Sequence, residues 1–316
     1  MKRRTLGLAM GFWLSTTAVA VADPLALSTE GAELSALIVT AGLNPNDPMY
    51  LPTLGAGFDA IARLIINFGT GCSGSLLGSG GHILTAGHCL DGATFLTGTL
   101  FSGETFTSSE FYVHPGWTGS IADGNDLAIA VLQSTLATPG YSLFGDLTFG
   151  IAAFGTGTVA GYGTTGNGNT GSTGPFGTLR SGLNEFWNWA MPGNAYSFDF
   201  DDPDGATCVP PGVGSGNAGY GLSEVITAPG DSGGPMFVGG LLAGVHSFIG
   251  RFPSGPLADC DAALNSSFGE FGGTTRVPFY RSWIEETVAG HPVPEPASLL
   301  LLGIGLVGVA RLRLRN

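Results

Sequence analysis

The chain has 316 residues, of which 43% are hydrophobic, 11% are charged and 54 are glycine. This length fits one large domain or two small ones, and abundant glycine beside short apolar runs favours an all-β fold with many tight turns. Between residues 23 and 295, five basic residues stand against all 24 acidic ones, a net charge near −19. Such a surface repels nucleic acid and anionic lipid, so nucleic-acid binding is excluded.

The N-terminus has the three parts of a secretory signal peptide. A basic start at Lys2–Arg4 is followed by an apolar run from Leu6 to Val21 and by an Ala-x-Ala ending. We therefore expect residues 1–22 to be a signal peptide that signal peptidase removes before Asp23. The alternative interpretation is a buried first helix.

Two strand-like segments carry side chains suited to acid–base chemistry. HILTAGHCL, at residues 82–90, places His88 at the end of an apolar run. GNDLAIAVL, at residues 124–132, places Asp126 at the mouth of an apolar strand, where a carboxylate is costly to bury unless it is paired. A histidine N–H would be such a partner. The alternative is an aspartate that only caps the turn before it.

Two segments of biased composition lie further along the chain. GTTGNGNTGSTGPFG, at residues 163–177, is of low complexity and predicts a surface loop. DFDDPDG, at residues 199–205, is acidic enough to suggest calcium, but its carboxylate spacing misses the EF-hand pattern and no Glu closes the loop. We therefore expect an acidic turn there, and neither a metal nor a cofactor in the protein.

GDSGGP, at residues 230–235, contains a candidate nucleophile in Ser232. A serine hydroxyl is a weak nucleophile, so it needs a base to take its proton and a third group to orient that base. His88 and Asp126 are the candidates for these two roles.

Together the three segments resemble the chymotrypsin-like (trypsin-like) serine protease family. TAGHC is similar to its histidine box, with Gly87 in place of the usual alanine, NDLAIAVL to its aspartate strand, and GDSGGP to its serine box. The order His, Asp, Ser along the chain is also that of the family. Further similar segments are GCSGSLL (71–77), VAGYGTT (159–165), HSFIG (246–250) and FYRSWIEETV (279–288).

The resemblance implies an all-β fold of two six-stranded antiparallel β-barrels followed by a C-terminal helix. Residues 55–290 would form this domain, and residues 23–54 would be a propeptide or an N-terminal arm. In the helix, Phe279, Trp283 and Val288 are expected near one face.

The resemblance also implies roles for four residues. Ser232 would attack the peptide carbonyl, His88 would be the general base and then the general acid, and Asp126 would hold the imidazole tautomer. The backbone N–H groups of Gly230 and Ser232 would form the oxyanion hole.

The primary specificity pocket is expected around four substrate-binding residues. Ile226 lies six residues before the serine and gives an apolar floor, and Gly272 keeps one wall open. Ser247 and Phe248 stand where the family has Ser-Trp. This implies a small or apolar side chain before the scissile bond.

Four cysteines in an exported chain predict disulfides. Cys72 and Cys89 match the family's bridge beside the histidine. Cys208 and Cys260 remain and are expected to pair.

The sequence departs from the family at the activation signal. Family zymogens are cut before an Ile-Val-Gly-Gly-like sequence, and the new amine pairs with the aspartate beside the serine, here Asp231. FDAIARLI (58–65) occupies that region instead. A buried unpaired carboxylate is costly, so Asp231 is expected to have another partner.

The C-terminus resembles the bacterial sorting tail named for its Pro-Glu-Pro motif. Residues 291–316 contain that motif at Pro294–Pro296, an apolar run at residues 297–310 and a closing series of arginines. The 14-residue run spans about 21 Å, short of a ~30 Å hydrocarbon core. The resemblance implies processing by an exosortase-type enzyme, and the alternative is a plain membrane anchor.

These features predict an exported serine endopeptidase of the cell surface or matrix, anchored at least transiently in the inner membrane by residues 297–310. Its partners would be a protein or peptide substrate, signal peptidase and the exosortase-type enzyme, with the membrane contacted only through the C-terminal segment. The alternative function is a catalytically silent, protease-like binding or matrix protein, and ester hydrolysis by the same residues also stays open.

Overall fold

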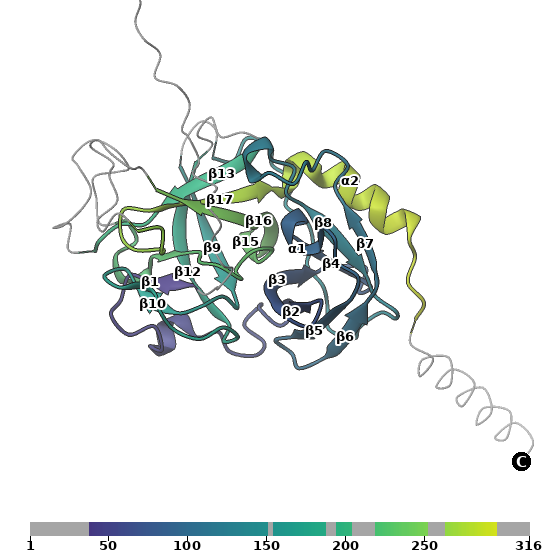
Figure 1. Cartoon of the computed structure of the whole chain (residues 1–316), viewed down its shortest axis with the longest axis horizontal. Coiled ribbons are helices and arrows are strands. Elements are labelled where there is room, and N and C mark those ends of the chain that lie inside the picture. The colour runs from purple at the N-terminus through teal and green to yellow at the C-terminus, as the bar shows by residue number, and fades with distance from the viewer. Residues whose placement is uncertain (1–37, 151–153, 188–193, 204–218, 252–262, 296–316) are drawn as a thin grey trace, which may run out of the picture. The chain divides into compact units, whose positions relative to one another are not determined.

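The computed structural model describes residues 38–150, 154–187, 194–203, 219–251 and 263–295 (Figure 1). The expected signal peptide, Cys208, Cys260 and the apolar run of the tail lie outside the described residues. The elements are β1 (Val39–Thr40), η1 (Pro48–Tyr50), β2 (Ile61–Ile66), β3 (Thr70–Leu76), β4 (His82–Thr85), α1 (Gly87–Leu90), β5 (Leu96–Leu100), β6 (Thr105–Ser108), β7 (Glu110–Val113), η2 (Ile121–Asp123), β8 (Ala128–Val131), β9 (Gly155–Gly161), β10 (Gly166–Asn167), β11 (Gly171–Ser172), β12 (Arg180–Phe186), β13 (Ala195–Asp199), η3 (Gly221–Ser223), β14 (Val225–Ile226), β15 (Pro235–Val238), β16 (Leu241–Gly250), β17 (Phe271–Arg276) and α2 (Val277–Gly290).

The first large sheet is antiparallel, with the strand order β6-β5-β2-β3-β4-β8-β7. Strands β2 and β8 are largely apolar, and all four residues of both β4 and β8 are buried. A single residue, Ser109, separates the two edge strands β6 and β7, which pair with β5 and β8 respectively. This continuous stretch therefore joins the two edges of the sheet and curls it into a barrel.

The second large sheet is also antiparallel and has the order β12-β9-β15-β16-β17-β13. Its edges meet where Trp187 and Ser197 exchange two backbone hydrogen bonds, of 3.0 and 2.8 Å. The architecture of two curled antiparallel sheets and a C-terminal helix confirms the predicted fold class.

A third, four-stranded sheet ties the N-terminal arm to the second barrel. Strand β1 lies between β10 and β14, with Val39 opposite both Gly166 and Ile226. Residues 163–177, expected to form a surface loop, thus contain the short β10–β11 hairpin. Glycine permits this hairpin, because a Cβ at Gly166 would lie 1.8 Å from the carbonyl oxygen of Gly171.

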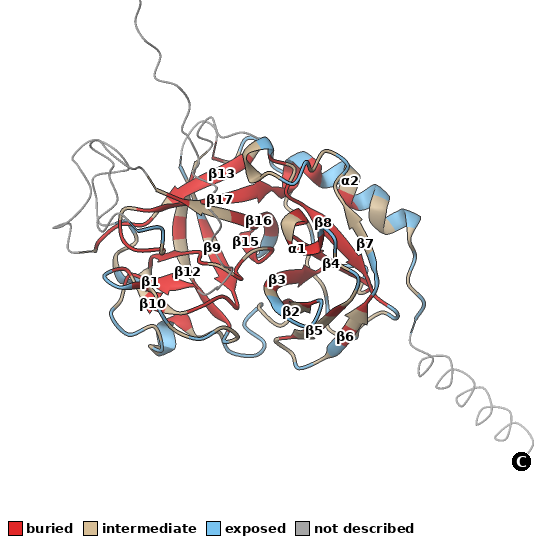
Figure 2. Cartoon of the chain, in the orientation of Figure 1, coloured by how far each residue is buried: buried red, intermediate tan, exposed pale blue. Residues whose placement is uncertain are grey.

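Helix α2 is present where the sequence predicts a helix, and Trp283 and Val288 pack against the apolar core, but Phe279 does not. Tyr280 and Ile284, one turn apart, are buried, whereas Phe279 is 52% exposed. Figure 2 shows exposed parts of α2 beside partly buried ones. Successive helical residues point about 100° apart, so Phe279 turns away when its neighbour Tyr280 faces the core. No helix in the described ranges is long and apolar enough to cross a membrane.

The two barrels share part of one apolar core. Its buried members include Leu76 and Leu84 from the first barrel and Ala160 and Val245 from the second. Because this cluster is continuous, it holds β3, β4, β8 and β16 in fixed relation, and these strands carry or adjoin the candidate site.

Candidate active site

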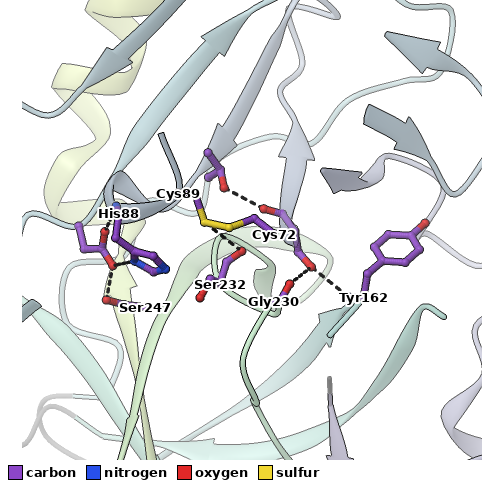
Figure 3. The surroundings of a disulfide bond; sticks show 10 residues. Cys72, His88, Cys89, Tyr162, Gly230, Ser232 and Ser247 are labelled. Atoms are coloured by element: carbon purple, nitrogen blue, oxygen red, sulfur yellow. Dashed lines mark hydrogen bonds and ion pairs between the residues drawn. A yellow bond between two sulfur atoms is a disulfide. The ribbon is translucent and has the colours of Figure 1, made fainter. Parts of the chain in front are cut away.

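His88 lies on α1, the single helical turn that follows β4. Ala86 and Gly87, which precede it, are both buried, and the His88 side chain is 19% exposed. Cys89 forms a disulfide with Cys72 of β3, which confirms the predicted pairing and links α1 to that strand (Figure 3). The cross-link therefore restrains the position of His88.

Asp126 is buried at the start of β8, as expected, with 1% of its side chain exposed. Its carboxylate accepts three hydrogen bonds: from His88 Nδ1 at 2.7 Å, from the His88 backbone N–H at 2.8 Å and from Ser247 Oγ at 2.5 Å. The preceding residue, Asn125, has a φ of 58°, and its amide donates to Gly116 O at 3.1 Å. This turn aims the Asp126 side chain at His88.

The pair is electrostatically coupled. Burial by itself would lower the pKa of His88, but the negative charge of Asp126 and the hydrogen bond to it hold this pKa above its usual value. Burial would raise the pKa of Asp126, and the charge and hydrogen bonds of His88, with that of Ser247, lower it instead. Asp126 thus stays ionised and favours a proton on Nδ1, which leaves Nε2 as the basic nitrogen.

Ser232 lies in the turn before β15, and Figure 3 shows its side chain pointing toward the His88 ring. Ser73 of β3 holds this turn: its N–H donates to Ser232 O at 2.8 Å and its Oγ donates to Gly230 O at 2.8 Å. In the described ranges no hydrogen bond joins Ser232 Oγ to the imidazole. Such contacts are often long without substrate and tighten when it binds.

Two backbone amides at this turn are unused. Across the described part of the chain, the N–H groups of Gly230 and Ser232 donate no hydrogen bond. Gly230 has a φ of 88°, a conformation that favours glycine. These amides are therefore available for an anionic oxygen next to the Ser232 hydroxyl.

The strand β16 fixes the serine turn from the other side. Gly233 N donates to His246 O at 2.8 Å, and His246 N donates to Gly234 O at 2.9 Å. Burial lowers the pKa of His246 to about 3, so its ring is neutral, and its Nδ1 lies 3.0 Å from Thr274 Oγ1. His246 is thus a structural residue.

Asp231 has partners other than an N-terminal amine. Its carboxylate is fully buried and accepts hydrogen bonds from Gly163 N at 2.8 Å and Ala228 N at 3.0 Å. Burial raises its pKa to about 7, even though the hydrogen bonds from the two amides and the positive charge of Arg180 act to lower it. The partner missing from the sequence pattern is therefore supplied by the backbone of the second barrel.

The N-terminal arm holds Arg180 near this aspartate. Arg180 is 3% exposed and donates to Pro45 O at 2.8 Å and to Asn46 Oδ1 at 2.7 Å. These contacts connect the arm to the turn that carries Ser232, a link that residue spacing does not reveal.

The predicted pocket residues lie differently from expectation. Ile226 is fully buried in β14. The ring of Phe198 fills the space beside Gly272. A Cβ added at position 272 would lie 2.1 Å from a carbon of that ring, so Gly272 leaves no open wall. The ring of Phe248 lies in the same way over Gly273.

The hydroxyl of Ser247, expected to be a substrate-binding residue, donates to Asp126. In the sequence, only the family resemblance indicated that Ser247 lies near the candidate site. The hydrogen bond to a residue 121 positions away is visible only in the fold.

Comparisons with known proteins agree with this architecture. The trypsin family model matches residues 56–185, a segment that contains His88 and Asp126 and ends before Ser232. The model of the PEP-CTERM protein-sorting motif matches residues 292–315. Both resemblances seen in the sequence are thus confirmed, and the motif indicates an exported protein with a C-terminal, membrane-associated sorting tail. No curated protein matches this chain.

Proposed function

We propose that this protein is an exported serine endopeptidase in which Ser232, His88 and Asp126 act as a catalytic triad. The observation that supports this most is the buried Asp126 carboxylate, which binds His88 through both Nδ1 and the backbone N–H. These two bonds fix the His88 imidazole beside the turn that carries Ser232. A carboxylate with a purely structural role would not require that arrangement.

In the proposed mechanism Ser232 Oγ attacks the scissile carbonyl carbon while His88 Nε2 takes the hydroxyl proton. The imidazolium that forms is stabilised by Asp126 and then gives its proton to the leaving amine. Water, activated by His88 in the same way, hydrolyses the acyl-enzyme. The unused amides of Gly230 and Ser232 bind the oxyanion, and one such donor contributes about 10²–10³-fold to turnover.

We further propose a preference for a small or apolar side chain before the scissile bond. The support is that Ile226, which lies six residues before Ser232 and is buried in β14, carries no charge to pair with Lys or Arg. Phe248, which is half-buried on β16 and lies over Gly273, also presents apolar surface.

The sorting motif supports a role at the cell surface or in the extracellular matrix. We propose that residues 297–310 hold the protein transiently in the inner membrane until an exosortase-type enzyme processes the tail. Signal peptidase would remove residues 1–22 during export.

An active-site probe tests the catalytic proposal. The full chain is produced in an exporting host and treated with a fluorophosphonate, which reacts with activated serines. We expect labelling of the wild type, none of Ser232→Ala, and unchanged labelling of a matched variant at an exposed serine on α2, Ser282→Ala. Absence of wild-type labelling in folded, disulfide-bonded protein would favour the non-catalytic alternative.

A peptide library tests the specificity proposal separately. Cleavage after small or apolar residues supports it, and preferred cleavage after Lys or Arg contradicts it. An enzyme that turns over esters but no peptide would limit the chemistry to ester hydrolysis.

A further inference from the structure

Three carboxylates gather on the second barrel, away from the candidate triad. One carboxylate oxygen from each of Asp199, Asp201 and Glu224 lies within 4.8 Å of the others. Asp199 ends β13 and Asp201 follows two positions later, so both side chains point to one side of the extended chain. Phe200 between them points to the other side and packs on Phe268, with ring centroids 4.8 Å apart.

Glu224 is brought to the cluster by the segment before β14. Its Oε1 accepts the backbone N–H of Asp201 at 2.8 Å, and its Oε2 accepts that of Tyr220 at 2.7 Å. Each carboxylate oxygen has a further lone pair, so these bonds orient Glu224 and leave it able to bind a cation.

One side-chain oxygen of Asp201 has no partner. The residue is 3% exposed, and its Oδ1 is buried without a hydrogen bond to any described residue. By contrast Glu270, which is fully buried, accepts the N–H groups of Asn265 at 2.7 Å and Ser266 at 2.8 Å. Since buried polar atoms are almost always paired, the bare Asp201 oxygen points to a ligand.

No basic side chain neutralises the cluster. In the described ranges the only ion pairs are His88–Asp126 and Arg281–Glu285. Burial raises the pKa values of Asp199, Asp201 and Glu224 to about 6, 7 and 9, and repulsion adds to it: from Glu185 on both aspartates, and between Asp199, Asp201 and Glu224 on the latter two. Ionised together, these carboxylates would need a positive charge between them.

We propose that Asp199, Asp201 and Glu224 bind a calcium ion. Ca²⁺ takes 6–8 oxygen ligands in flexible geometry, and three carboxylates can supply up to six. The donor set contains no His or Cys, which zinc and copper prefer. An exported protein meets calcium at concentrations that suit the weak sites of extracellular modules, with Kd of about 10⁻⁴–10⁻³ M.

The ligands come from two separate segments, which explains why the EF-hand spacing is missing. Asp201 and Glu224 are 23 residues apart, so no single loop contains the set. The ion would connect the end of β13 to the segment leading into β14. It would thereby stabilise the third sheet, in which β14 pairs with β1.

Thermal unfolding with calcium chloride tests this proposal without relying on catalysis. The full chain carries Ser232→Ala as background, which removes self-cleavage as a source of calcium effects. In EDTA, adding CaCl₂ to about 10 mM should raise the Tm by roughly 5–10 °C with saturation, as expected for a ligand at about 100 times its Kd. An equal concentration of MgCl₂ should raise it much less.

Two variants locate the site. Asp201→Asn should raise the Tm in EDTA, because it removes repulsion, and should weaken calcium binding by at least about tenfold in titration calorimetry. Asp199→Asn, at a more exposed position, should weaken binding in the same way. Glu185→Gln is the matched control, since Glu185 lies in electrostatic range of Asp201 but outside the cluster.

The proposal is overturned if calcium gives no saturable rise in Tm. It is also overturned if Asp201→Asn and Asp199→Asn bind calcium as tightly as the background protein. Both outcomes are independent of whether Ser232 reacts with a fluorophosphonate.

Discussion

The substitution Asp126→Asn probes the centre of the proposed mechanism. The carboxylate accepts hydrogen bonds from His88 Nδ1, from the His88 N–H and from Ser247 Oγ. An amide has nearly the same shape but only one accepting oxygen, and its NH₂ donates. If that NH₂ faces Nδ1, the imidazole must accept there and carry its proton on Nε2.

In that tautomer Nε2 cannot take the Ser232 proton. We therefore expect turnover to fall on the order of 10⁴-fold, equivalent to about 5 kcal/mol of transition-state stabilisation. The free energy of unfolding should change less than the transition-state stabilisation does, because one charge-assisted hydrogen bond contributes about 1.5–3 kcal/mol.

The assay compares initial rates on an apolar peptide substrate with Tm for wild type, Asp126→Asn and Ser247→Ala. The serine variant removes one donor to Asp126 but leaves the tautomer, so its rate should fall far less. A loss below about tenfold for a folded Asp126→Asn protein would refute the tautomer argument.

Further predictions concern pH, the disulfide and the arm. As the pH falls, kcat/KM should drop through the raised pKa of His88, because an imidazolium cannot accept a proton; the midpoint should lie above about 6.5, and a lower one would contradict the coupling. Removing the 17-residue link by Cys72→Ala with Cys89→Ala should cost about 3 kcal/mol and lower the Tm by roughly 6–12 °C, and an unchanged Tm would argue against its structural role. Arg180→Leu takes away the buried cation facing Asp231, so Tm should fall by more than about 6 °C and fluorophosphonate labelling should weaken; retention of both would disprove the link between arm and serine turn.

Much of the candidate site was predictable because its parts are local. His88, Asp126 and Ser232 each stand in a short segment whose residues also shape the surrounding backbone: a buried strand end, a turn before a strand, and glycines with positive φ. The Cys72–Cys89 pairing was predicted through the family resemblance, and the structure shows that the β3–β4 hairpin brings the two cysteines together.

Other features were not predictable because they depend on packing direction. Phe279 has the hydrophobicity of a core residue, yet Tyr280 is buried in its place. Gly272 reads as space for a substrate, but the Phe198 ring occupies that space. In each case the amino-acid sequence does not specify which side chain faces the core. That orientation is decided only when the strands and the helix pack together.

The sequence by itself determined the β-rich fold class, the sorting tail and the identity of the residues proposed for catalysis. These depend on short-range patterns of apolar, small and chemically reactive side chains. Only the tertiary structure decided the partners of buried charges: the amides of Gly163 and Ala228 for Asp231, Ser247 for Asp126, and the meeting of Asp201 with Glu224. A buried charge must be matched by whatever lies next to it in space, and that neighbour can come from anywhere along the chain.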